Sequence, residues 1–140
     1  MNGLKDVSDR VLTAFNEQNA AALAKNYAED QVTICSGVPE PVCGRKAKEE
    51  FVGGFFRAFP DLNLDLTCVL ESQDHVVCEG VMRGTHKGPL VSPEGEVPPT
   101  GKKLDLKVVY ILRVSPEGLV EEDRTYFDNV DFLSQLGLMG

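Results

Sequence analysis

Four segments in the second half of the chain alternate apolar and polar residues, and this pattern constrains the fold more than any other feature. The segments span residues 62–72, 75–85, 104–114 and 119–127. Alternation with a period of two is typical of β-strands that bury one face and expose the other. Short polar turns join neighbouring segments, for example at 115–118, so we expect consecutive antiparallel strands.

The first half of the chain shows helical periodicity instead. Apolar residues recur at spacings of three and four from Leu4 onwards, which predicts a helix that ends near Asn19 and a second helix over 20–28. A third helix is expected over 44–59, and the β-branched segment 31–36 predicts a strand. Helices followed by consecutive antiparallel strands predict an α+β fold, with the N-terminal helices packed on one face of a strongly curved, mostly antiparallel sheet.

Length and composition limit the possible functions. The chain has 140 residues, enough for one core, so we expect a single domain over 1–140. A net charge of -8 argues against a nucleic-acid partner, because such binding depends on Lys and Arg that meet phosphates. No apolar run approaches the ~20 residues that span a bilayer, and the first residues lack the features of a signal peptide. We therefore expect no membrane partner and a cytoplasmic location.

The cysteines and histidines do not predict a metal site. Cys35, Cys43, Cys68 and Cys78 form no Cys-x-x-Cys pair, and only two histidines accompany them. In a reducing compartment such thiols are expected to be small buried side chains rather than disulfides. The sequence also lacks a Gly-rich phosphate loop and a nucleophile elbow, so we predict no cofactor.

The last predicted strand is rich in polar groups. Side chains two positions apart share a face of a strand. One face carries Glu122, Arg124, Tyr126 and Asp128. The other face carries Asp123, Thr125 and Phe127. Four polar or ionisable groups on one face either meet solvent or line a pocket, and the pattern alone leaves both possibilities open.

Asp128 has two candidate roles. Because Asp131 follows three residues later, Asp128 can be the N-cap of a helix over 129–136 with an acid at its third position. Asp128 can also be a carboxylate at the inner end of a strand, where a partly apolar pocket suits a general acid or base. The two roles are compatible with each other.

Four further residues are candidates for the same site. His86 ends a predicted strand just before a long loop, where an imidazole suits proton transfer or a surface position. Tyr110 is expected to face the core, where its hydroxyl either donates a hydrogen bond into a pocket or reaches solvent. Arg124 either holds a substrate oxygen or pairs with Asp128 and weakens it as a base. Glu79 either lines the cavity or faces water.

The loop over 87–103 is longer than most. Loops beyond ~12–15 residues are uncommon in compact domains unless they are functional or disordered. Its prolines limit disorder, and Leu90, Val91 and Val97 give it apolar side chains to pack. We expect either a flap over a site or a mobile hairpin tip.

Several motifs together resemble one known family. They are Gly84-Thr-His86, the loop segment Pro99-Thr-Gly-Lys102, Glu122-x-x-x-Tyr-x-Asp128 and Leu133-Ser-Gln-Leu-Gly137. This combination, spread over nearly the whole chain, resembles the SnoaL-like polyketide cyclases, which belong to the nuclear-transport-factor-like or ketosteroid-isomerase-like group. The resemblance implies a cystatin-like α+β cone whose sheet wraps a deep apolar cavity. It also implies a homodimer formed through the open face of the sheet.

The resemblance further implies a reaction. Cyclases of this family use an Asp at the Asp128 position as general acid and base in an intramolecular aldol closure without a cofactor. Tyr110 lies on a strand where the cyclases tend to carry His, and Arg124 stands where they often carry Trp. Together with the alternation and the loop, the resemblance favours an inward position for the face that carries Asp128, with this residue as the deepest acid.

We therefore expect a cofactor-independent cyclase or isomerase that acts on a small hydrophobic molecule, either carbonyl-containing or polyketide-like. The predicted catalytic residues are Asp128 and His86, where Asp128 abstracts a proton beside a carbonyl. The predicted substrate-binding residues are Tyr110, Arg124, Tyr126 and Glu79. Two alternatives remain: an epoxide-hydrolase-like enzyme that uses Glu122 or Glu79 as a second acid, and a non-catalytic ligand-binding or dimerisation module.

Overall fold

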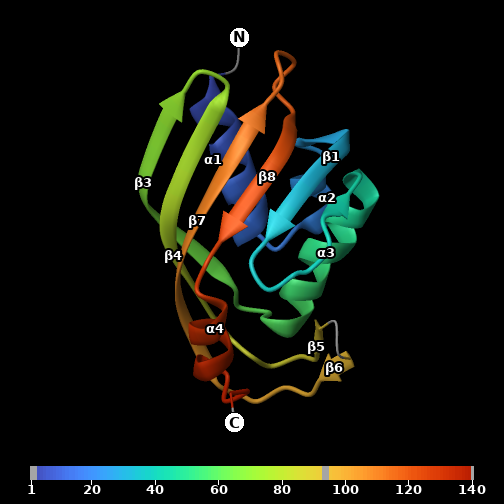
Figure 1. The fold of residues 1–140 in the computed structure, drawn as a ribbon, viewed down its shortest axis with the longest axis vertical. Helices are drawn as coiled ribbons and strands as arrows, with labels where there is room; N and C mark the ends of the chain where they lie inside the picture. Colours follow the sequence, from blue (N-terminus) through green and yellow to red (C-terminus); the bar gives the residue numbers. More distant parts are fainter. Residues whose placement is uncertain (1–2, 93–94, 140) are drawn as a thin grey trace.

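The fold is a curved sheet with three helices on one side (Figure 1). The computed structural model describes residues 3–92 and 95–139. Six strands pair in the order β2-β1-β8-β7-β4-β3, and two more form a separate hairpin. The strands are β1 (Tyr27–Cys35), β2 (Val42–Cys43), β3 (Asn63–Ser72), β4 (His75–Thr85), β5 (Leu90–Ser92), β6 (Gly95–Val97), β7 (Lys103–Val114) and β8 (Val120–Tyr126). Since β1 and β8 are the one parallel pair described, the α+β prediction with a mostly antiparallel sheet is confirmed.

The helices bury apolar stripes against the sheet. They are α1 (Leu4–Asn16), α2 (Ala20–Ala24), α3 (Arg45–Ala58) and the short α4 (Asn129–Gln135). Val7, Val11 and Ala14, three and four positions apart on α1, are buried because this spacing places them on one side of a helix. Phe15 of α1 meets Phe56 of α3 edge to face, with ring centroids 5.3 Å apart. The core therefore lies between the helices and the sheet.

The second helix is shorter than its pattern predicts. It ends at Ala24, and Tyr27 begins β1 instead of sharing a helical face with Leu23. The Val120 N–H donates to the Asn26 carbonyl at 2.8 Å, and Tyr27 stands opposite Val120 in the ladder. Pairing with a strand from the other end of the chain thus overrides the local helical pattern.

A bulge and a glycine bend the sheet where β3 pairs with β4. The register between these strands shifts between Leu66 and Cys68. At this point β3 comes so close to Gly80 that a Cβ there would collide with the carbonyl oxygen of Asp65. Bulges increase local twist and bend, and glycine allows the close backbone approach. This bend helps the sheet to curve around its interior.

The segment 87–103 forms a small hairpin beside the end of α3 (Figure 1). The tip of the predicted flap, residues 93–94, lies outside the described residues. At the base of the hairpin, the N–H groups of Lys87 and Gly88 both donate to the carbonyl of Ala58, at 3.0 and 3.1 Å. These bonds anchor the segment to the C-terminal end of α3.

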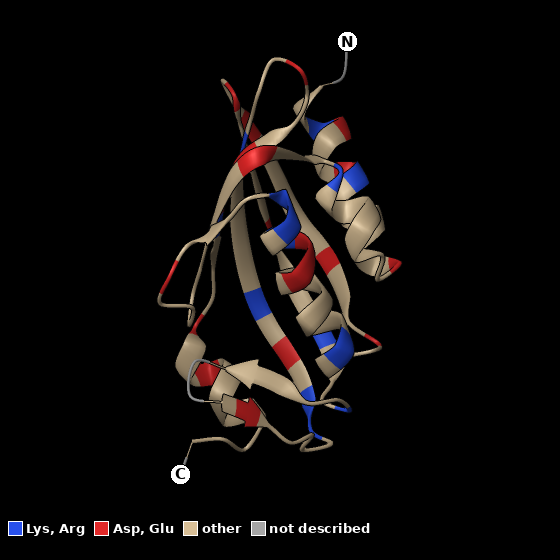
Figure 2. Ribbon diagram, turned by 90° about the vertical axis from the view of Figure 1, so that its right-hand side faces the viewer, with Lys and Arg blue, Asp and Glu red and all other residues tan. Residues whose placement is uncertain are grey.

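The surface mixes charges of both signs. On the side shown in Figure 2, Lys and Arg are interspersed with Asp and Glu, and no continuous basic stripe is visible. Within the described ranges, no helix is both long and apolar enough to cross a membrane. All four cysteines are free, but Cys43 is exposed rather than buried. Cys35 and Cys78 are buried as predicted, and Cys68 is half-buried.

Candidate active site

The inward face of β8 is the opposite of the predicted one. The residues of the last strand region that line the interior are Asp123, Thr125 and Phe127. The predicted inward face carries Glu122, Arg124, Tyr126 and Asp128, and none of these residues lines the cavity. The prediction for this face, with Asp128 as its deepest acid, is therefore wrong.

A β-bulge explains the reversal. Val114 of β7 stands opposite Val120, whereas the next pair along β8 begins at Glu122. Glu121 is the extra residue, and one extra residue exchanges the two faces of a strand. Val120 and Asp123 consequently both point inward, and they are 0% and 4% exposed. The alternating pattern contains no signal that reveals such an insertion.

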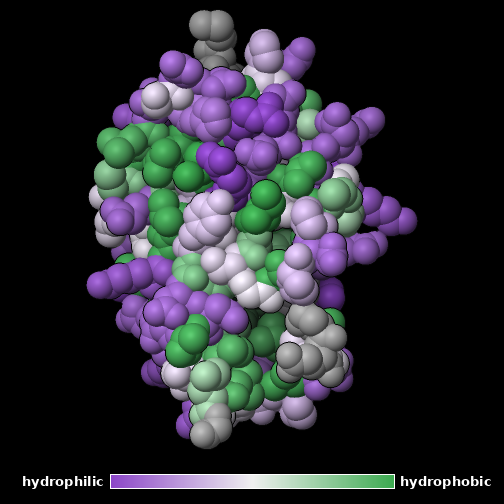
Figure 3. Space-filling model, in the orientation of Figure 1, coloured by the Kyte–Doolittle hydropathy of each residue, from purple (hydrophilic) through white to green (hydrophobic). Residues whose placement is uncertain are grey.

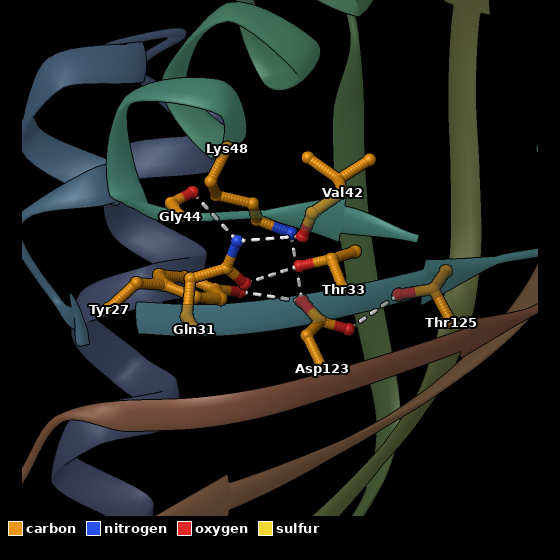
Figure 4. A network of polar contacts seen from close by, with 8 residues as sticks. All are labelled: Tyr27, Gln31, Thr33, Val42, Gly44, Lys48, Asp123 and Thr125. Carbon is orange, nitrogen blue, oxygen red and sulfur yellow. Dashed lines mark hydrogen bonds and ion pairs between the residues drawn. The ribbon is translucent and has the colours of Figure 1, made fainter. Parts of the chain in front are cut away.

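Asp123 is the centre of a buried polar cluster (Figure 4). Its Oδ2 accepts a hydrogen bond from the Tyr27 hydroxyl at 2.6 Å and another from Lys48 Nζ at 3.1 Å. Its Oδ1 accepts a bond from the Thr125 hydroxyl at 2.7 Å. Lys48 comes from α3, so helix and sheet meet in this ion pair. Both charged side chains are almost completely buried, at 6% and 5% exposure.

A second set of hydrogen bonds supports the strand beside this cluster. The Thr33 hydroxyl donates to Gln31 Oε1 at 2.6 Å. Gln31 Nε2 in turn donates to the carbonyls of Val42 and Gly44, at 3.1 and 2.9 Å (Figure 4). Because these carbonyls precede α3, the bonds fix the start of the helix that delivers Lys48. Buried polar groups that are satisfied in this way rigidify their surroundings.

Asp123 and Lys48 lie on the wall of an apolar cavity of about 100 Å³ between the helices and the sheet. A space of this size holds several water molecules or part of a small ligand. The other lining residues are Val11, Leu12, Phe15, Leu23, Tyr27, Thr33, Cys35, Phe51, Val52, Phe55, Leu62, Leu64, Met82, Val108, Tyr110, Thr125, Phe127 and Phe132. Among the described residues, Asp123 is the one acid in this lining, and none of the residues 87–92 and 95–103 belongs to it.

Burial keeps the hydroxyl and thiol groups of the cavity protonated. Burial, assisted by the negative charge of Asp123, raises the pKa of Tyr27 well above its ordinary value. Burial likewise raises the pKa of Tyr110, and it raises the pKa of Cys35 to about 12. Tyr110 therefore faces the interior as predicted, and its hydroxyl, which lies beside the Cys78 thiol, has no nitrogen or oxygen partner among the described residues.

His86 is buried outside the cavity. Its Nδ1 accepts the Thr100 N–H at 3.2 Å and lies 3.0 Å from the Thr100 hydroxyl oxygen. Its backbone N–H donates to Lys102, and its carbonyl accepts from Gly101. Burial lowers the pKa of His86, so the neutral imidazole is favoured. His86 thus connects the two ends of the 87–103 segment, and it is not among the residues that line the cavity with Asp123.

The remaining predicted residues lie at the surface. Asp128 is exposed and caps α4, because its Oδ1 accepts the Asp131 N–H at 3.1 Å. Glu79 is exposed on β4. Arg124 Nε lies 3.7 Å from Glu122 Oε1, and the pairing with Asp128, one of the two roles considered for Arg124, is not seen among the described residues. Tyr126, 43% exposed, also lies on the outer face.

Sequence reasoning missed Lys48, although a signal for it exists. The apolar stripe of α3 includes Phe51 and Phe55, and Lys48 occupies the next position of that stripe. A charged residue in an apolar stripe must pair inside the protein, because an isolated buried charge is costly. Its partner could not be named without the tertiary structure. No group of three or more His, Cys, Asp or Glu in the described part of the chain is arranged to hold a metal ion.

Known proteins share this architecture. The structure matches IdmH from Streptomyces antibioticus, a candidate polyketide cyclase, with 26% identity and a TM-score of 0.79 over 97% of this chain and 99% of that one. It matches AclR from Streptomyces galilaeus, a candidate hydroxylase, with 23% identity and a TM-score of 0.81 over 98% and 97% of the two chains. A protein of ketosteroid isomerase-like fold from Catenulispora acidiphila, solved with trimethylamine, has 20% identity and a TM-score of 0.79 over 95% and 93%.

These likenesses confirm the ketosteroid isomerase-like cone. Among curated proteins, no match to this chain is found. The family description SnoaL-like polyketide cyclase, in contrast, matches residues 5–136, which is nearly the whole chain. The expected family is thereby confirmed, and this chain belongs to the SnoaL-like polyketide cyclases.

Proposed function

We propose that the protein is a cofactor-independent cyclase or isomerase for a small apolar carbonyl compound, with Asp123 as general acid and base. The observation that carries this proposal is the buried Asp123 carboxylate, the one acid among the described residues that line an apolar cavity, with the Tyr110 hydroxyl in the same lining. The membership in a cyclase family supports the reaction class. The predicted role of Asp128 thus moves to Asp123.

The hydrogen bonds of Asp123 leave one acceptor position of its carboxylate free. A carboxylate has about four acceptor positions on its two oxygens. Three are occupied, by Tyr27, Lys48 and Thr125. The free position is on Oδ1, and it suits the abstraction of a proton from a carbon beside a carbonyl. The three donors hold the carboxylate in one orientation, which lowers the cost of positioning it for each reaction.

The oxygen of the resulting enolate needs a donor. Tyr110 belongs to the same lining, and its hydroxyl stays protonated because burial raises its pKa. A preorganised donor in an apolar cavity stabilises developing negative charge more strongly than it would in water. Lys48 supplies positive charge beside Asp123. We therefore propose Tyr110 as the substrate-binding donor and Lys48 as an electrostatic partner.

The epoxide-hydrolase alternative receives less support. An enzyme of that kind would need a second acid beside the first one, with a water molecule between the acids and the substrate. Asp123 is the one acid among the described lining residues, and Glu79 and Glu122 lie on the outer face. A non-catalytic ligand-binding module would share the cavity but would not exchange protons with its ligand, so a proton-exchange assay distinguishes it.

The test measures hydrogen–deuterium exchange at carbons beside a ketone. The purified protein is incubated in D₂O with 2-tetralone, a bicyclic apolar ketone, and exchange is followed by ¹H NMR. We expect wild-type protein to accelerate exchange over buffer, and Asp123→Asn to lower that acceleration by about 10²–10⁴-fold. Asp128→Asn is the matched control, because Asn is also a good N-cap and the residue lies outside the cavity.

The outcomes separate three possibilities. Loss of exchange in Asp123→Asn with full exchange in Asp128→Asn supports the proposal. The reverse result would return the role to Asp128. Specific binding of 2-tetralone without accelerated exchange in wild-type protein would contradict a catalytic function and favour the binding module. Circular dichroism of each variant confirms that it is folded.

A further inference from the structure

We propose that Lys48 binds the carbonyl carbon of the ligand covalently as a Schiff base, with Asp123 as its proton partner. This inference rests on the proposed function in one respect, because it takes a carbonyl compound as the ligand of the cavity. It adds a covalent step and a second catalytic residue to general acid–base chemistry at Asp123.

The position of the amine is the first argument. The Lys48 side chain lines the cavity and is 6% exposed. Nζ lies 4.6 Å from the centroid of the Tyr27 ring and 6.0 Å from that of Phe51. Its one hydrogen-bond acceptor among the described residues is Asp123. An ammonium has three donors, so two N–H groups of Lys48 meet aromatic and apolar surroundings instead of oxygen atoms.

The amine and its proton acceptor are in direct contact inside the protein. Nζ and Oδ2 are 3.1 Å apart, so the proton can pass directly from Lys48 to Asp123. Desolvation in an apolar pocket is a recognised way to activate a lysine that attacks carbonyl groups.

The step balances without a further reactant. Asp123 takes one proton from the ammonium, and the nitrogen lone pair forms a bond to the carbonyl carbon as the C=O π bond breaks. A second proton then moves from this nitrogen to the former carbonyl oxygen, which becomes a hydroxyl group. Asp123 then returns its proton to the resulting hydroxyl group, which leaves as water as the C=N bond forms. The products are water and a protonated imine paired with the Asp123 carboxylate. This carboxylate is then free to take a proton from the neighbouring carbon, which the positively charged imine acidifies.

A structural ion pair would explain the same contacts, so the test needs a covalent readout. The full chain is incubated with 2-tetralone, reduced with sodium cyanoborohydride, digested and analysed by peptide mass spectrometry. Cyanoborohydride delivers hydride to the imine carbon and makes the bond permanent. We expect modification of Lys48 in wild-type protein and its loss in Lys48→Arg, which keeps the positive charge. Lys46→Arg is the matched control, since Lys46 is exposed on the same helix.

The mass readout and the exchange assay can fail separately. Accelerated exchange with an unmodified Lys48 would overturn the Schiff base and leave Asp123 as general base. A Lys48 adduct without accelerated exchange would support this inference and contradict the proposed proton transfer. Adducts confined to exposed lysines, or no adduct at all, would overturn it. If Lys48→Arg does not fold, the site of modification in wild-type protein and in Lys46→Arg decides the question.

Discussion

Removal of one partner of the buried ion pair should cost much more stability than replacement of both. In Lys48→Met the Asp123 carboxylate keeps the hydrogen bonds from Tyr27 and Thr125 but loses its counterion. An uncompensated charge at this depth costs about 3–5 kcal/mol of unfolding free energy. In the double variant Lys48→Met/Asp123→Asn the charge is absent, and the neutral amide can retain part of the hydrogen bonding. The double variant should therefore be more stable than Lys48→Met alone.

The expected shift in melting temperature follows from the length of the chain. The unfolding entropy near the midpoint is about 2.1 cal/mol/K per residue, so for 140 residues each kcal/mol corresponds to about 3 °C. Lys48→Met should thus melt about 10–17 °C below wild-type protein. Because the chain has no Trp, far-UV circular dichroism is the suitable probe for both heat and urea unfolding.

Two results would refute this reasoning. If the double variant loses as much unfolding free energy as the two single variants lose together, the two charges do not interact in the folded protein. A loss of unfolding free energy below about 1 kcal/mol in Lys48→Met would mean that water reaches the site, as it does at exposed ion pairs. Lys46→Met provides the control on the same helix, and its exposed side chain should change stability by no more than about 0.5 kcal/mol.

Three further predictions concern other parts of the molecule. Gly80→Ala should destabilise the protein by about 1–3 kcal/mol, because the new Cβ collides with the backbone of β3. Gly53→Ala should stabilise the protein by up to about 1 kcal/mol, because Gly53 lies in the middle of α3 and its new Cβ makes ordinary contacts. Urea unfolding measures both changes. Burial lowers the pKa of His86 in the folded state, so the unfolded chain binds a proton at this residue at a higher pH than the folded protein does. The free energy of unfolding should therefore fall as the pH drops below about 6.5, and it should fall less steeply in the His86→Gln variant. Figure 3 shows hydrophobic residues among hydrophilic ones on the outer sheet face, where Ile34 and Tyr126 are 39% and 43% exposed. We propose that two copies pair through this face, so Ile34→Glu/Tyr126→Glu should sediment as a monomer where wild-type protein sediments as a dimer; equal sedimentation coefficients would contradict the proposal.

The sequence alone predicts most of the architecture, because periodicity reports which side of each element is buried. The alternation of the later strands and the stripe of α3 are local properties, and each lies within a residue or two of the observed element. The cap at Asp128 was also predictable, since it depends only on residues within one helical turn. The family follows from motifs that are contiguous in the chain.

The candidate site depended on the tertiary structure. The bulge at Glu121 is set by how β8 pairs with β7, and this single extra residue decides that Asp123 points inward in place of Asp128. Tyr27 and Lys48 are distant from Asp123 in the chain, so local patterns could not bring the three together. Periodicity determines which side of a segment is buried, but the register between strands determines which polar residue stands at the cavity, because a shift of one residue reverses every side chain that follows.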